Sequence, residues 1–270
     1  MTIEQFAQQN RAAFEQVPDL AVEHMMSDLL ELAIEAHGGL TRWRALRSIA
    51  ITLSLTGGLW RLKGYPDGMH GMRLEIDPRQ PSVITQPLGP LRALNPAHIR
   101  GHFKPDCVWV EHSDGEVVGQ RQDPRASFAG HELSTPWDEL HELYFRSYAF
   151  WNYVTTPFLL AEAGFEAREI GQHQENGETW RRLVVRFPAH VPTHTREQTF
   201  YFSQQGLLRR VDYELDIAGA APAAHYCFDH ATFDGLVVPT LRRVVARAPE
   251  GPMLSGPTAA LVQITDVCAK

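Results

Sequence analysis

The stretches TWRRLVVRF (179–187), REQTFYFS (196–203), GLLRRVDYELDIAG (206–219), AAHYCFDHATF (223–233) and VVPTLRRVVAR (237–247) decide the fold. Successive side chains of a strand point to opposite faces, so alternating character predicts a strand with two different faces. In the third stretch the two alternating sets are Val211, Tyr213, Leu215 and Ile217, and Arg210, Asp212, Glu214 and Asp216. A sheet with one apolar and one polar face is normally antiparallel, with one face packed against the core and the other exposed to solvent.

Turn-forming residues separate these strands. Gln205-Gly206, the segment from Gly219 to Pro222, and Asp234-Gly235 are short connections of the hairpin type. Connections this short leave no room for crossover helices, so residues 164–270 are expected to form an antiparallel meander. We predict an α+β fold: a strongly curved antiparallel sheet that forms an unclosed half-barrel, with helices covering its concave face.

The remainder of the chain fits one domain of 270 residues. Residues 1–47 are expected to hold N-terminal helices, at 2–16 and 20–36, and residues 48–135 the first part of the sheet, beginning with alternation at 49–56. An aromatic helix is predicted over 136–163. Thr135 would be its N-cap, Pro136 its first residue and Asp138 the acid of a capping box, while Pro157 would kink or split it.

Composition excludes several classes of protein. The net charge of −7 and the pI of about 6.0 argue against nucleic-acid binding. No apolar run approaches the roughly 18 residues that indicate a membrane span. The first residues lack a basic segment followed by an apolar one, and the three cysteines form neither a disulfide framework nor a zinc pattern. A cytoplasmic location is therefore expected; the oligomeric state is left open.

Motifs for cofactors are missing. The chain has no GxGxxG after a strand, no P-loop, no GxSxG and no HExxH, so no cofactor is expected. His190 and His194 have the four-residue spacing that binds metal on a helix, but Pro192 between them disfavours a helix, and we predict no metal site.

The predicted helix carries candidate ligand-binding residues. Its aromatic side chains point to several sides, so it is expected to be buried in the core, with Trp151 largely hidden. The same rings and hydroxyls are suited to a pocket wall. His141 and Tyr144 share one side of the helix, as do Tyr148 and Asn152. The predicted ligand-binding residues are His141, Tyr144, Trp151, Asn152 and Tyr213.

A candidate catalytic group lies on the fourth stretch. His225, Cys227 and Asp229 share one face there, and a carboxylate near an imidazole can orient it for acid–base chemistry. Tyr148 would donate a hydrogen bond to a substrate oxygen. A polar strand face exposed to solvent explains His225 and Asp229 as well as the catalytic interpretation does. The aromatic side chains of Tyr226 and Phe228 favour the opposite face as the one packed against the core. The register beside Asp212 or Tyr213 is undecided.

Two segments resemble the LolA/LolB-like lipoprotein-carrier superfamily. These are AHGGLTRWRALRSIAITLSL (36–55), a helix, a small-residue turn and a first strand, and YFSQQGLLRRVDY (201–213), a strand, a glycine turn and another strand. The resemblance implies an unclosed β-barrel whose concave face is covered by helices, with an apolar cavity that holds acyl chains.

Two functional hypotheses follow, beside the plainer alternative of a scaffold or interaction protein. The first is a cytoplasmic protein that binds a hydrophobic or aromatic small molecule in the half-barrel. The alternative is an enzyme without a nucleotide cofactor that performs acid–base chemistry, of the isomerase, cyclase or lyase type, on such a molecule. Titratable groups with perturbed pKa values in the cavity would favour the enzyme, and an almost entirely apolar lining would favour the carrier.

Overall fold

One curved antiparallel sheet forms the frame of the protein. The computed structural model describes residues 27–65, 68–86, 99–248 and 251–270. In that part of the chain the sheet has 14 strands, in the order β6-β5-β4-β3-β2-β1-β14-β12-β11-β10-β9-β8-β7, with the short β13 paired to β12. The strands are β1 Ile49–Thr56, β2 Met69–Ile76, β3 Val83–Gln86, β4 Ile99–Lys104, β5 Cys107–His112, β6 Val117–Gln122, β7 Glu166–Glu175, β8 Glu178–Arg186, β9 Glu197–Phe202, β10 Leu208–Leu215, β11 Ala221–Phe233, β12 Leu236–Ala248, β13 Gly251–Pro252 and β14 Ala260–Ala269.

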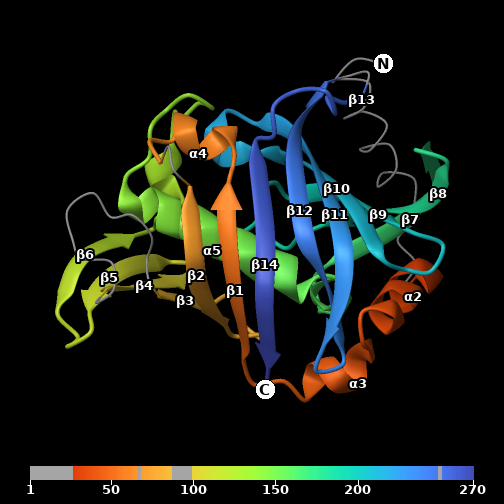
Figure 1. Ribbon diagram of the computed structural model, residues 1–270, viewed down its shortest axis with the longest axis horizontal. Coiled ribbons are helices and arrows are strands. Elements are labelled where there is room, and N and C mark those ends of the chain that lie inside the picture. The colour runs from red at the N-terminus through yellow and green to blue at the C-terminus, as the bar shows by residue number, and fades with distance from the viewer. Residues whose placement is uncertain (1–26, 66–67, 87–98, 249–250) are drawn as a thin grey trace.

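The chain fills this sheet in two passes. It starts in the middle at β1 and proceeds outward to the edge strand β6, then crosses to the opposite edge, β7, and returns to β14 beside β1. The helix α5 (Glu139–Thr155) makes the crossing. At 1.5 Å per residue it is roughly 25 Å long, enough to cross much of the hollow. Figure 1 shows α5 passing behind β2, β1, β14 and β12 on the concave side. The predicted α+β half-barrel is confirmed.

The other helices are short. They are α2 (Asp28–Ala36), α3 (Gly39–Arg44) and α4 (Gly58–Leu62), with 3₁₀ turns at Ala126–Phe128, Phe158–Ala161 and Asp216–Ala218. The bend between α2 and α3 lies against the β11–β12 hairpin. A Cβ on Gly38 would come within 2.4 Å of the carbonyl oxygen of Gly235, so only glycine fits there. The helix predicted over 2–16, and residues 20–26 of the next one, lie outside the described residues.

The boundaries of α5 differ from the prediction. The helix begins after Asp138, which accepts a hydrogen bond from the backbone N–H of His141 at 2.8 Å, while the His141 side chain faces the N–H of Asp138. Asp138 is therefore the N-cap rather than Thr135, and Thr135 instead accepts from the N–H of Glu132. The α-helix ends at Thr155, and Pro157 starts a separate 3₁₀ turn, so the predicted helix over 136–163 is split.

Residues 58–62 form α4 between β1 and β2, and β4 forms a hairpin with β5. Two differences from the expected strands concern the third stretch. The expectation of a wet outer face fails on β10, because Arg210 and Asp212 are buried together with Tyr201 and Tyr226. Asp216 and Ile217 belong to a 3₁₀ turn beyond the strand, where the alternation no longer applies.

Candidate functional site

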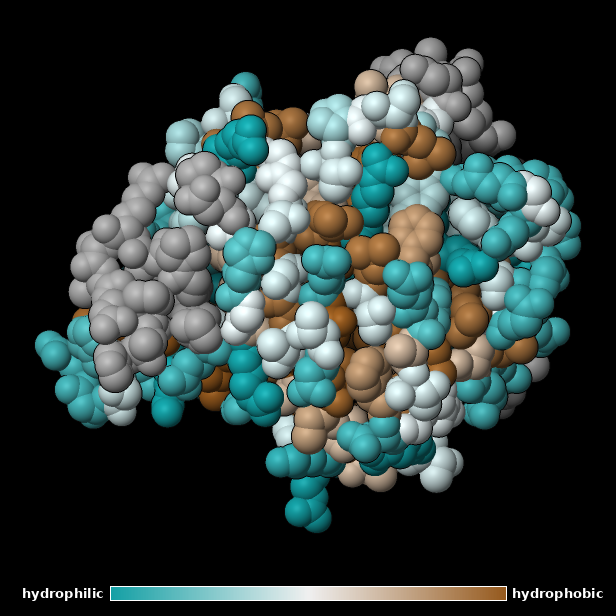
Figure 2. Space-filling view, in the orientation of Figure 1, coloured by the Kyte–Doolittle hydropathy of each residue, from teal (hydrophilic) through white to brown (hydrophobic). Residues whose placement is uncertain are grey.

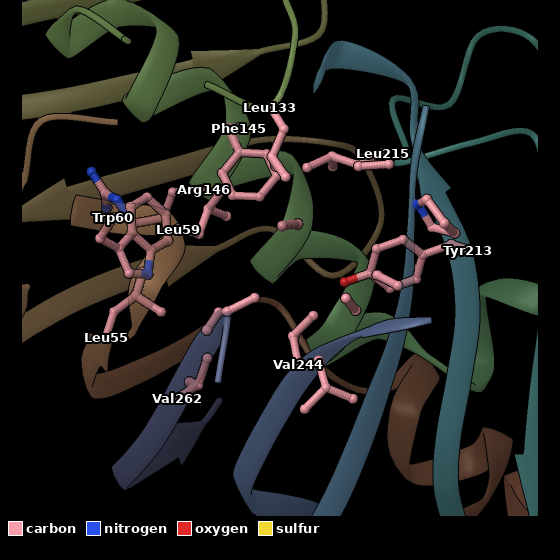
Figure 3. A pocket seen from close by; sticks show the side chains of 18 of the residues that line it. Leu55, Leu59, Trp60, Leu133, Phe145, Arg146, Tyr213, Leu215, Val244 and Val262 are labelled. Carbon is pink, nitrogen blue, oxygen red and sulfur yellow. The ribbon is translucent and has the colours of Figure 1, made fainter. Parts of the chain in front are cut away.

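A cavity of about 340 Å³ lies between α5 and the concave face of the sheet (Figure 3). Side chains from both passes of the chain form its wall, which is why no single stretch of sequence reveals it. The lining residues are Leu55, Leu59, Trp60, Leu133, Phe145, Arg146, Ala149, Phe150, Tyr153, Tyr213, Leu215, Ala221, Pro222, Ala223, Val244, Val245, Ala246, Arg247, Ala259, Ala260 and Val262. Most of these are aliphatic or aromatic. The cavity is therefore suited to an apolar guest.

Both arginines of the wall are paired with acids. Arg146 is fully buried and donates to both carboxylate oxygens of Glu142, one turn earlier in α5, at 2.5 and 3.0 Å. It also donates to the hydroxyl of Thr85 at 2.9 Å. The guanidinium of Arg247 lies 3.9 Å from Asp212, which belongs to the network on the outer face. Each positive charge next to the cavity thus has a carboxylate partner.

One corner of the cavity is polar. Tyr153 and Tyr213 line the cavity and are hydrogen-bonded to each other. Behind them lies His194, whose Nε2 is 2.7 Å from the Tyr153 hydroxyl and whose Nδ1 is 3.1 Å from the Tyr148 hydroxyl. The ring of His194 stacks on that of Tyr213, with centroids 4.2 Å apart. Three phenols and one imidazole form a continuous chain of hydrogen bonds.

Asn152 holds the segment that carries His194. Its side-chain amide donates to the carbonyl oxygens of Tyr148 and Pro192, at 2.7 and 2.8 Å. Arg125 fixes the same segment from the other side by donating to the carbonyl oxygen of Thr193 at 2.8 Å. Asn152 is thus a positioning residue and does not line the cavity.

Burial keeps the whole corner uncharged. It lowers the pKa of His194 to about 3, with the charge of Arg125 as a second cause. It raises the pKa of Tyr153 to about 12, and those of Tyr148 and Tyr213 well above their usual value. At neutral pH every member is therefore neutral, and none is poised to exchange protons with a substrate.

His225 is buried next to this corner. Its ring meets that of Tyr153 edge-on at 4.6 Å, and neither ring nitrogen has a hydrogen-bond partner among the described residues. Burial lowers its pKa well below the usual value, with Arg242 and His194 as further causes. The buried Arg242 donates to the Cys227 sulfur at 3.3 Å and to the carbonyl oxygen of Tyr153 at 3.1 Å. Arg242 thereby caps the last turn of α5.

The structure separates His225 from Asp229. Residues four apart on a strand are roughly 13 Å apart, and Asp229 has a φ of +51° and an exposed side chain, whereas His225 is fully buried. The register pairs Val211 with His225, which places Tyr213 rather than Asp212 on the same side. The expected carboxylate–imidazole pair is therefore absent from the described residues. The expectation that Tyr226 and Phe228 face the core is also wrong, since His225 and Cys227 do.

The predicted ligand-binding residues fall in different places. Tyr213 lines the cavity, and Tyr148 lies two hydrogen bonds behind its wall, through His194 and Tyr153. Trp151 is buried, as expected, but its indole donates to the carbonyl oxygen of Asp77 at 2.9 Å, away from the cavity. Tyr144 packs on Phe103 and Phe128, and His141 caps α5. Trp151, Tyr144 and His141 are therefore structural in this conformation.

The spacing to His190 marked His194 only as a candidate metal ligand. His190 is exposed, whereas both nitrogens of the buried His194 face tyrosines, so the two do not form a pair. Among the described residues, no group of three or more His, Cys, Asp or Glu side chains is arranged to hold a metal ion. No sequence signal links His194 to its partners, which lie 41 and 46 residues away.

These features define an open antiparallel half-barrel with one helix across its concave face and an apolar cavity beneath it. Solved structures have a similar fold. A LolA superfamily protein from Nitrosomonas europaea matches with a TM-score of 0.50 and 9% identity over 90% of this chain and 92% of the other. A putative outer membrane lipoprotein-sorting protein domain from Vibrio parahaemolyticus matches with a TM-score of 0.50 and 10% identity, over 89% and 92%.

The fold is therefore LolA-like, as the two resembling segments implied. At this low identity the likeness extends to the fold alone. No protein-family model and no curated protein matches the sequence. No helix in the described ranges is long and apolar enough to cross a membrane.

Proposed function

We propose that the protein binds a hydrophobic small molecule in the cavity beneath α5. The observation that carries this proposal is the lining itself: aliphatic and aromatic side chains, arginines paired with acids, and one neutral polar corner. The names of the matching structures, a LolA superfamily protein and a putative lipoprotein-sorting domain, agree with a role in holding apolar molecules. Burial of apolar surface would provide the binding energy, about 0.8 kcal/mol for each methylene group.

The enzyme alternative has less support. It requires a titratable group near neutrality in the cavity, and burial lowers the pKa of both nearby histidines, His194 and His225, far from that range. Its proposed partners His225 and Asp229 are also separated. A cytoplasmic location stays a prediction from the sequence.

A cavity-filling substitution tests the proposal. Val244 projects into the cavity from β12, as Figure 3 shows, and Val244→Phe should fill part of the space at a cost of about 1–3 kcal/mol of stability. We expect the neutral dye Nile red to bind the wild type and its affinity to fall at least about tenfold in this variant. Val117→Phe, on the exposed strand β6, is the matched control and should bind the dye like the wild type.

Native mass spectrometry of the gently purified protein should also reveal a retained apolar compound that Val244→Phe lacks. Equal dye affinity in Val244→Phe and wild type would place the dye elsewhere and would contradict the proposal.

A further inference from the structure

The hydrogen-bonded chain at the polar corner ends at the cavity. It joins Tyr148, His194, Tyr153 and Tyr213 in that order. Tyr148, at the far end, is completely buried. Tyr213, at the near end, points its hydroxyl toward the open space under α5 (Figure 3). The two ends of the chain are therefore in different surroundings.

The protons of this chain can be counted. Each neutral tyrosine carries one hydroxyl proton and the neutral imidazole carries one N–H, which makes four protons for three hydrogen bonds. A neutral imidazole donates from one nitrogen and accepts at the other, so the two hydrogen bonds of His194 run in the same direction. The proton left over is therefore that of Tyr148, or that of one of the two tyrosines that line the cavity, Tyr153 and Tyr213.

The Tyr148 end is unsuited to hold that proton. Among the described residues its hydroxyl has no hydrogen-bond partner except His194, and a buried donor without an acceptor costs about 1–3 kcal/mol. Burial raises the pKa of Tyr148 and the charge of Arg125 opposes this, so a positive charge lies near the hydroxyl and turns its proton away, toward His194. The chain thus runs from Tyr148 to His194 and then to Tyr153, which leaves one hydroxyl proton on the Tyr153–Tyr213 pair at the cavity. When Tyr153 donates to Tyr213, the Tyr213 hydroxyl presents this proton to the cavity.

We propose that Tyr213 is the specificity-determining residue of the cavity, and that the ligand is an uncharged, largely apolar molecule with one hydrogen-bond acceptor, such as an ester or ketone oxygen. This rests on the proposed function and narrows its ligand class. A pure hydrocarbon would leave one hydroxyl proton of the Tyr153–Tyr213 pair without an acceptor, whereas a carbonyl oxygen accepts it from Tyr213. An ionised carboxylate would meet only neutral groups at this corner, and the two arginines of the wall are already paired with acids, so little offsets the loss of its hydration.

Matched probes test the ligand class. We expect 2-undecanone to displace Nile red with a Kd about tenfold lower than that of undecane, since a satisfied hydrogen bond is worth about 1 kcal/mol and a stranded donor costs more. Decanoate at pH 8 should bind more weakly than the ketone. Tyr213→Phe should bring the ketone and the hydrocarbon within about twofold of each other and leave the affinity for undecane unchanged.

Tyr201→Phe is the control variant, because it removes the same hydroxyl from the outer face of the neighbouring strand β9. It should retain the preference for the ketone. If undecane and 2-undecanone bind wild type equally, or if decanoate matches the ketone, this inference is overturned while the proposed function stands. If neither binds, the proposed function fails.

A second readout does not depend on any variant of Tyr213. The direction of the chain requires the proton of His194 on Nε2, with Nδ1 accepting from Tyr148. Two-bond ¹H–¹⁵N spectra of the histidine-labelled protein distinguish the tautomers, and His194→Gln identifies the signal. An Nδ1–H tautomer would overturn the inference.

Discussion

The two faces of β10 and β11 differ in how they hold polar groups. On the concave face Tyr213 and His225 belong to a neutral cluster of phenols and imidazoles beside the cavity. On the convex face Arg210 is stacked near Tyr201 and donates to Asp212 and Glu175, at 2.5–2.8 Å. Figure 2 shows that face as a mixture of hydrophilic and hydrophobic residues. Both clusters are buried, yet only the outer one is ionised.

The difference follows from what lies beside each cluster. The outer network has two carboxylates for Arg210, and tyrosine hydroxyls satisfy the same acids: Tyr201 donates to Asp212 at 2.9 Å and Tyr226 to Glu175 at 2.6 Å. The inner cluster adjoins an apolar space, where an ion would lose its hydration without a partner. Tyrosine hydroxyls thus donate to ionised acids on one face and belong to a neutral hydrogen-bonded chain on the other. The four predictions below test this contrast.

The largest effect is expected from the packing on the concave side. Trp151 of α5 is buried and hydrogen-bonded to the backbone at Asp77, so Trp151→Ala should reduce the free energy of unfolding by about 3–5 kcal/mol. Urea denaturation measures it. Trp109→Ala, on the partly exposed strand β5, is the control and should cost less. A loss below about 1 kcal/mol for Trp151→Ala would contradict the prediction that packing of α5 against the concave face of the sheet stabilises the fold.

The outer face should respond to loss of charge. Asp212→Asn leaves the buried Arg210 with Glu175 as its remaining acid partner, and we expect a loss of about 3 kcal/mol in urea denaturation. The double variant Arg210→Met/Asp212→Asn removes the guanidinium that Asp212→Asn leaves with one acid partner instead of two, and it should recover a large part of that loss. If the double variant is less stable than Asp212→Asn alone, the stability lost in Asp212→Asn does not come from the charge of Arg210.

The inner face should instead make stability depend on pH. The pKa of His194 is about 3 in the folded protein and about 6.5 when unfolded, so protonation favours unfolding. The contribution of His194 to the free energy of unfolding is constant above about pH 6.5 and decreases as the pH falls toward 3. At pH 5 the protein has lost about 2 kcal/mol of this stability. His194→Gln should remove this part of the slope in melts from pH 7 to 5. His190→Gln, at an exposed position, should not. Equal slopes in all three proteins would show that His194 is not buried in its neutral form.

The sequence predicts the frame of this molecule better than its site. Alternation and hairpin turns report on local periodicity, and they predicted the half-barrel and the aromatic helix in its hollow. They could not show which face of β11 is inside, because His225 and Cys227 alternate with Tyr226 and Phe228, and neither set is clearly apolar. Hydropathy therefore favoured the wrong face.

The polar corner depends on long-range placement. His194 lies in a proline-flanked loop without periodicity, and Asn152 and Arg125 bring it to the tyrosines. The cavity likewise combines β1 and α4 with α5, β10, β11, β12 and β14. Such contacts across the chain have no local signature in the sequence.

The smallest effect is expected for an exposed ion pair on the same strands as the outer network. Arg209 of β10 donates to both oxygens of Glu178 on β8, at 3.0 and 2.9 Å, but the Glu178 side chain is 49% exposed against 4% for Asp212. Water solvates this pair and screens it, so Glu178→Gln should change the free energy of unfolding by less than about 0.5 kcal/mol. Urea denaturation beside Asp212→Asn makes the comparison direct, because each variant replaces one carboxylate by its amide. A loss for Glu178→Gln as large as that for Asp212→Asn would mean that burial does not distinguish the two pairs, and the contrast between hidden and solvated charge on the outer face would fail.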